Sequence, residues 1–181
     1  TVHTAFNHPV VTAKQIATLD QLSKGRLGLN VVAGWNKPEY DAFGIELPSA
    51  HVDRYRMAQE WIDYIQKLWK EDAPFDWEGE FYRGKGVYSL PHPVQSHLPI
   101  LNAAASKEGR EFAMRNADFL FTPVFDFDQA AATVEDIRQL AAQAQRTVNV
   151  LTFSTVVCRP TQQEAEDYLD YYANQHADWE A

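Results

Sequence analysis

The sequence has little of what secreted, membrane-spanning or nucleic-acid-binding proteins need. Cys158 is the only cysteine among 181 residues, which excludes a disulfide within the chain and suits a reducing cytoplasm. No apolar run approaches the roughly 20 residues of a membrane span, and no signal peptide precedes the first predicted strand. Acidic residues outnumber basic ones by 25 to 16, without a basic stripe. We therefore expect a cytoplasmic protein that binds neither nucleic acid nor membrane.

Several catalytic and binding motifs are also missing. The chain has no GxGxxG, Walker A or GxSxG motif, which argues against the usual dinucleotide fold, P-loop enzymes and serine hydrolases. It has no HxH, HExxH or Cys/His cluster, so we predict no metal site. Cys158 closes an apolar run and is interpreted as a core residue, not a nucleophile.

What is present is a regular alternation of strand-like and helix-like segments. Apolar runs predict five strands, and apolar spacing of three and four residues predicts five helices. Possible helix-capping residues are Asp53, Ser106 and Thr161, the last with Glu164 as a capping box. The alternation is typical of right-handed βαβ units on a parallel sheet, so the predicted fold class is α/β. The predicted strands are 1–6, 26–33, 98–105, 117–124 and 147–158; the helices are 9–25, 53–70, 106–116, 126–145 and 161–174.

The chain has no linker-like segment, so we predict one domain over residues 1–181. Alternating aromatic residues and glycines in residues 72–95 predict an inserted β-hairpin. A closed eight-stranded TIM barrel needs about 250 residues, and five units fall short of it. Because the chain also begins inside a strand-like run, we expect it to be part of a longer barrel.

The densest polar stretch follows the second predicted strand, in NVVAGWNKPEYDAFG (30–44). Catalytic residues of parallel α/β enzymes gather at the carboxyl ends of strands, and long loops such as 34–52 are usually functional. The amide of Asn30 can pair with the edge of a heteroaromatic ring; alternatively, it ties down the following loop. Glu39 can accept a hydrogen bond from a ligand hydroxyl or cap the loop.

Two predicted helix N-termini offer sites for an anion. Arg54 and Tyr55 combine a guanidinium and a hydroxyl with backbone N–H groups, which suits a phosphate. The alternative is that Arg54 pairs with Asp53 or Glu60. Ser106 can bind a phosphate, act as an ordinary N-cap, or do both.

His3, at the end of the first predicted strand, can donate to a substrate or act as an acid or base, or it can be a satisfied buried histidine. His8 follows in the next loop. The remaining histidines, His51, His92, His97 and His176, are scattered through loops and near the end of the chain.

With these residues the sequence resembles the bacterial luciferase-like flavin monooxygenases, in the branch of the pyrimidine, alkanesulfonate and dimethylsulfone monooxygenases. The resemblance covers most of residues 1–124, and its most specific part is GLNVVAGWNKPEYD (28–41). This part lies within a longer matching segment, residues 13–44. The other matching segments are TVHT (1–4), DRYR (53–56), FDWEGEFYRGKG (75–86) and AAASKEGREFAMRNADFLF (103–121).

The resemblance implies a TIM barrel that binds reduced FMN at the carboxyl ends of its strands, here without the family's first two strands and last strand. Asn30 and Glu39 match positions that contact the flavin, and Arg54, Tyr55 and Ser106 match its phosphate end. His3 matches a position facing the flavin and is the candidate catalytic residue. Relatives often have a glycine before the serine where this chain has Ala105.

The implied activity is a two-component monooxygenase, in which a separate flavin reductase supplies reduced FMN. The enzyme would use O2 to oxygenate a small organic substrate, and the family usually forms homo-oligomers. Two alternatives stay open: a reductase or dehydrogenase that uses the deazaflavin F420, and a barrel fragment without activity of its own.

Overall fold

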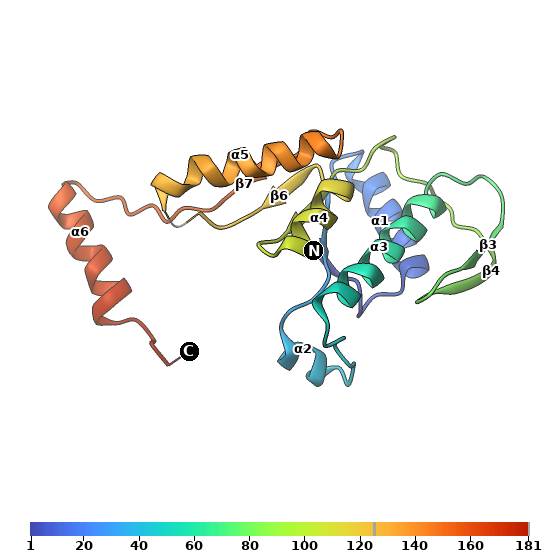
Figure 1. The fold of residues 1–181 in the computed structure, drawn as a ribbon, viewed down its shortest axis with the longest axis horizontal. Helices are drawn as coiled ribbons and strands as arrows, with labels where there is room; N and C mark the ends of the chain where they lie inside the picture. Colours follow the sequence, from blue (N-terminus) through green and yellow to red (C-terminus); the bar gives the residue numbers. More distant parts are fainter. Residues whose placement is uncertain (125, 181) are drawn as a thin grey trace.

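The computed structural model describes residues 1–124 and 126–180. Its centre is a five-stranded, wholly parallel sheet in the order β1-β2-β5-β6-β7 (Figure 1). The order of the strands in this sheet is therefore their order along the chain, as is typical of the predicted βαβ units. The strands are β1 (Val2–His3), β2 (Leu29–Val32), β5 (Ile100–Ala103), β6 (Phe119–Phe121) and β7 (Asn149–Leu151).

A helix follows each of the first four strands and helps to cover one face of the sheet: α1 (Pro9–Ser23), α3 (His51–Leu68), α4 (Lys107–Asn116) and α5 (Phe127–Gln143). The strands send alternate residues into the core beneath these helices, including Leu29, Val31, Ile100 and Leu120. Trp61, Ile62 and Ile65 of α3 are fully buried against them. We call residues 1–151, apart from residue 125, the body.

The opposite face of the sheet is less covered. Asn30, Val32 and Leu101 alternate with the core residues and are partly buried, while Ala103 is exposed. The registers align Asn30 with Leu101 and Leu101 with Phe119, so these side chains form a row across three strands. In a closed barrel this face is the interior.

An antiparallel hairpin, β3 (Phe75–Glu78) and β4 (Arg83–Val87), lies within the predicted insertion. Glu60 of α3 holds the hairpin, because its carboxylate accepts hydrogen bonds from the backbone of Phe81 and Tyr82 and from Trp77 Nε1. The segment that follows the hairpin is held in the same way by Asp20, which is fully buried. Asp20 accepts from the backbone N–H groups of Val94 and Gln95 and from the Gln95 side chain.

The structure corrects several predicted boundaries. Helix α3 begins at His51 after Ala50, so Asp53 is not its N-cap but lies in the first turn, paired with Arg56. The loop 34–52 contains a short helix, α2 (Lys37–Ala42). The strands predicted at 1–6 and 147–158 are two and three residues long. Strand β7 pairs with β6 only over Asn149–Leu151, and a strand ends where its partner ends.

Residues 152–180, which we call the arm, extend away from the body (Figure 1). They contain α6 (Gln162–Asp170), continued by one π-helical stretch, η1 (Tyr171–Gln175). No residue of the arm is buried, so the interpretation of Cys158 as a core residue is wrong: Cys158 is exposed, because the segment beyond β7 leaves the sheet. Among the residues that the structure describes, no helix is both long and apolar enough to cross a membrane.

Candidate functional site

A cavity of about 270 Å³ lies at the carboxyl ends of β2 and β5. Three elements meet there: the segment after β2, the first turn of α3, and the segment leading from β5 into α4. This is the edge at which parallel α/β folds bind ligands. The lining residues are Val32, Ala33, Gly34, Trp35, His51, Tyr55, Ala103, Ala104, Ala105 and Ser106.

Glycine makes this arrangement possible at two points. Gly34 has a φ of +106°, and a Cβ there would lie 1.7 Å from the Tyr40 hydroxyl. A Cβ on Gly109, in the first turn of α4, would lie 2.5 Å from the Tyr55 hydroxyl. Any larger residue at position 109 would therefore push Tyr55 away from α4. Alanines at positions 103–105 also line the cavity, and their side chains are small.

Two hydroxyl groups converge on the cavity, Tyr55 from α3 and Ser106 from the N-terminus of α4. The predicted cap is confirmed: Ser106 Oγ accepts a hydrogen bond from Gly109 N at 3.1 Å. The Ser106 side chain also interacts with the Tyr55 hydroxyl. Burial raises the pKa of Tyr55, while Ser106 and the Arg54 charge act in the opposite direction. Tyr55 therefore remains a hydrogen-bond donor at neutral pH.

Arg54 stabilises the wall of this cavity. Its Nη1 donates to the carbonyl oxygen of Gly34 at 3.0 Å, so neither Asp53 nor Glu60 is its hydrogen-bonding partner. Its Nε is buried without a hydrogen-bonding partner in the described part of the chain. A buried donor without a partner is unusual and is consistent with a group that a ligand satisfies.

The other predicted site residues are more dispersed. Asn30 Nδ2 donates to Thr1 Oγ1 at 3.1 Å, and Asn30 Oδ1 is buried without a partner among the described residues. His3 stacks on Phe6 with 5.1 Å between ring centroids, and its Nδ1 is likewise buried and unpaired there. Glu39 is exposed on α2 and does not line the cavity.

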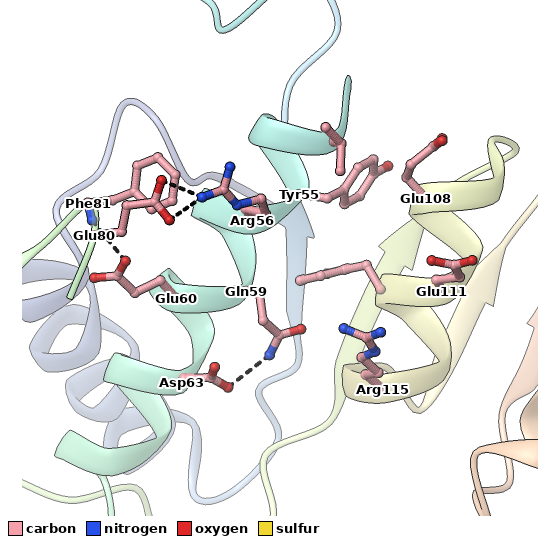
Figure 2. Close-up of a pocket in the computed structure, with 12 residues that line it drawn as sticks. Tyr55, Arg56, Gln59, Glu60, Asp63, Glu80, Phe81, Glu108, Glu111 and Arg115 are labelled. Atoms are coloured by element: carbon pink, nitrogen blue, oxygen red, sulfur yellow. Dashed lines mark hydrogen bonds and ion pairs between the residues drawn. The ribbon is translucent and has the colours of Figure 1, made fainter. Parts of the chain in front are cut away.

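A larger groove of about 460 Å³ lies on the outer side, between α3, α4 and the hairpin (Figure 2). Most of its charged groups already have partners: Arg56 pairs with Glu80, and Glu60 holds the hairpin. Asp63 accepts from Gln59, and burial raises the pKa of Asp63. Figure 2 shows Tyr55 extending from α3 toward the first turn of α4, where Glu108 lies.

Two lining residues with ring side chains, His51 and Trp35, are not among the site residues predicted from the sequence. The sequence predicts His51 in a loop, but it is the first residue of α3. Trp35 is 74% exposed at the cavity rim. The signals for Trp35 were its place in the polar stretch 30–44 and its position immediately after Gly34 at a strand end. Within the described residues, no group of three or more His, Cys, Asp or Glu side chains could hold a metal ion.

The sheet and its covering helices form a segment of a parallel β/α barrel. The cavity at the carboxyl ends of the strands lies between two helix N-termini, which favour an anion. The whole chain, residues 1–181, matches the family model described as luciferase-like monooxygenase. The chain belongs to the luciferase-like monooxygenase family.

The similar proteins include flavin enzymes. The chain is 36% identical to an FMNH2-dependent dimethylsulfone monooxygenase of Pseudomonas putida, over 89% of the chain and 44% of that protein. It is 31% identical to the pyrimidine monooxygenase RutA of Acinetobacter baylyi, over 100% of the chain and 49% of that protein. The crystal structure of DmoA from Hyphomicrobium sulfonivorans superposes with a TM-score of 0.85 and 27% identity, over 98% of the chain and 43% of DmoA.

The chain thus spans slightly less than half the length of the relatives it matches. The predicted fold, a partial luciferase-like barrel of about five βα units with an inserted hairpin, is confirmed. The roles of the individual site residues stay predictions.

Proposed function

We propose that this chain carries the phosphate end of an FMN site in a two-component monooxygenase, which uses reduced FMN and O2 to oxygenate a small organic substrate. The observation that carries the proposal is the convergence of Tyr55 and Ser106 on a cavity between two helix N-termini. The relatives named as FMNH2-dependent support the choice of cofactor. A flavin reductase as partner, a homo-oligomeric assembly and a cytoplasmic location belong to the same proposal.

The residues present fit a flavin phosphate. Ser106 Oγ accepts from Gly109 N, so its own hydroxyl proton can turn from the Tyr55 hydroxyl to a phosphate oxygen. Tyr55 supplies a second hydroxyl donor, and the first turns of α3 and α4 add partial positive charge. Arg54 fixes the Gly34 carbonyl and retains an unpaired buried Nε.

Asn30 and His3 lie on the less covered face of the sheet, and each keeps a buried polar atom for a ring or substrate. Reduced FMN, when bound, supplies the electrons for oxygen activation. The chain's part is to bind, to orient and to exclude water. Trp35 at the cavity rim and the α2 loop are placed to shield the site. Glu39, exposed on α2, would have to approach with this loop.

The phosphate site can be tested by titrating the chain with FMN and with riboflavin, which lacks the phosphate. We expect FMN to bind more tightly. Ser106→Ala and Tyr55→Phe should each weaken FMN binding about tenfold and leave riboflavin unchanged, because a hydrogen bond to a charged group is lost. Ser154→Ala and Tyr168→Phe, both in the exposed arm, are the matched controls. Equal affinity for the two flavins would contradict the proposal.

Arg54→Ala should also weaken FMN binding several-fold or more, through loss of the Gly34 contact and of positive charge. Unchanged FMN affinity in this variant would remove Arg54 from the site.

Aerobic turnover with reduced FMN, compared with anaerobic hydride transfer from reduced F420, distinguishes the monooxygenase from the F420-dependent alternative. A chain that binds neither cofactor would agree with an inactive fragment.

A further inference from the structure

The last residues of the five parallel strands form one row on the less covered face of the sheet. We call this row the edge layer: His3, Val32, Ala103, Phe121 and Leu151. It lies at the carboxyl ends of the strands, where parallel β/α barrels place their active sites. Val32 and Ala103 also line the cavity assigned to the flavin phosphate. The edge layer therefore continues from that cavity across β6 and β7.

The side chains of the edge layer become larger away from the cavity. Val32 and Ala103 are small, whereas the ring of Phe121 stacks on that of Phe153, with 6.1 Å between the centroids and an interplanar angle of 18°. A centroid separation of this size is typical of favourable aromatic pairs. Phe121 pairs in register with Ala103, and neighbouring strands lie about 4.8 Å apart. The aromatic pair thus begins one strand away from the cavity wall.

The edge layer carries little charge. It contains no Asp, Glu, Lys or Arg, and its one titratable member among the described residues, His3, lies at the far end of the row, on β1. The row beneath it is also free of charged side chains: Asn30, Leu101, Phe119 and Asn149. Moving an ion out of water without an opposite charge is unfavourable, whereas an apolar ring gains from leaving water. This surface therefore favours a neutral ring over an anion.

We propose that Phe121 is a specificity-determining residue, and that the substrate is an uncharged molecule whose apolar ring packs against it. Phe153 is the positioning residue, because its ring holds that of Phe121 by stacking. The inference rests on the proposed function for the reaction, but it does not involve the side chains assigned to the phosphate. The small side chains of Val32 and Ala103 leave the adjoining part of the edge layer to the flavin.

The competing explanation is that the two rings only attach the arm to β6. Such a contact would contribute to stability and would affect the binding of every substrate equally. A ring-binding wall, in contrast, selects for a ring and against a negative charge. The ratios between the affinities of matched compounds therefore separate the two explanations.

The test titrates the chain with three compounds and follows binding by NMR. Methyl phenyl sulfone is neutral and has a ring, benzenesulfonate has the same ring and a negative charge, and dimethyl sulfone is neutral without a ring. We expect methyl phenyl sulfone to bind most tightly. Phe121→Ala should weaken its binding about three- to tenfold and leave dimethyl sulfone unchanged. Phe153→Ala should have a smaller effect, and Phe127→Ala, which removes a 92% exposed ring from α5, should have none.

Equal affinities of the wild-type chain for methyl phenyl sulfone and benzenesulfonate would overturn the inference, as would binding of neither. An unchanged ratio of methyl phenyl sulfone to dimethyl sulfone affinities in Phe121→Ala would also overturn it. Should Phe121→Ala fail to fold, Phe121→Leu removes the ring and keeps apolar bulk, and the same ratio decides. The preference for FMN over riboflavin tests the proposed function separately, and Phe121→Ala should keep that preference. A wild-type chain that selects the neutral ring without preferring FMN would refute the phosphate site alone.

Discussion

Helix α4 of the body and helix α6 of the arm begin in the same way. Ser106 accepts from the backbone N–H three residues on, and so does Thr161, which adds the full capping box with Glu164. Yet α4 buries five of its residues against the body, and α6 buries none. A cap and an apolar spacing are thus sufficient to specify a helix, but only neighbouring elements give it a tertiary position.

The largest difference between body and arm is expected in the free energy of unfolding that is lost when a tryptophan is replaced by alanine. Trp61 is fully buried, and its Nε1 donates to Asn7 O at 2.7 Å, whereas Trp179 is 78% exposed. We expect Trp61→Ala to lower the free energy of unfolding by about 3–5 kcal/mol, because it creates a cavity in the core. Trp179→Ala should leave it unchanged. Urea denaturation of both variants measures this, and similar losses would mean that the arm packs on the body.

A smaller effect is expected at Asp20, which anchors the segment that follows the hairpin. Burial alone would raise its pKa, but hydrogen bonds from Gln95 and Val94 outweigh burial, so the pKa of Asp20 is lowered. Its stabilisation is then present above the unfolded value of about 3.9 and is lost as the pH falls through the folded pKa.

Asp20→Asn should therefore cost about 1–3 kcal/mol at neutral pH, because an amide cannot accept all of these hydrogen bonds. The difference from wild type should shrink between about pH 5 and pH 2. Unfolding free energies measured over this pH range test the prediction. A difference that does not depend on pH would show that the Asp20 charge is not what holds the segment.

The smallest effect should come from the cap of the arm. Thr161→Ala should destabilise α6 by about 1 kcal/mol, and this loss should be confined to faster amide exchange within residues 162–170. Asp126→Ala, which removes the N-cap of α5 in the body, should instead lower the global unfolding free energy by a similar amount. A global effect of Thr161→Ala would show that the arm unfolds together with the body.

Much of the fold could be predicted because its signals are local. The helical periodicity, the caps at Ser106 and Thr161 and the aromatic alternation of the hairpin are all present within short windows of sequence. The start of α3 could not be predicted, since Ala50 offers no capping side chain. Helix α2 is only six residues long and lies in a loop rich in turn-forming residues, so its periodicity is too short to recognise.

Some features of the candidate site could likewise be predicted from the sequence, and others could not. Tyr55 and Ser106 could be brought together from the sequence, because both lie near the carboxyl ends of parallel strands. The contacts from Arg54 to Gly34 O and from His51 to Glu108 could not, because they depend on where side chains from different elements meet. Glu60 likewise binds a hairpin some 20 residues further along the chain.

The order of the strands also bears on how the chain folds during synthesis. In β1-β2-β5-β6-β7, each new strand pairs with the strand made immediately before it in the sheet. Its partner has therefore already left the ribosome when the strand emerges. Glu60 likewise precedes the hairpin that it anchors. Among the described strands, the sheet can therefore grow in one direction, from β1 toward β7, as the polypeptide lengthens.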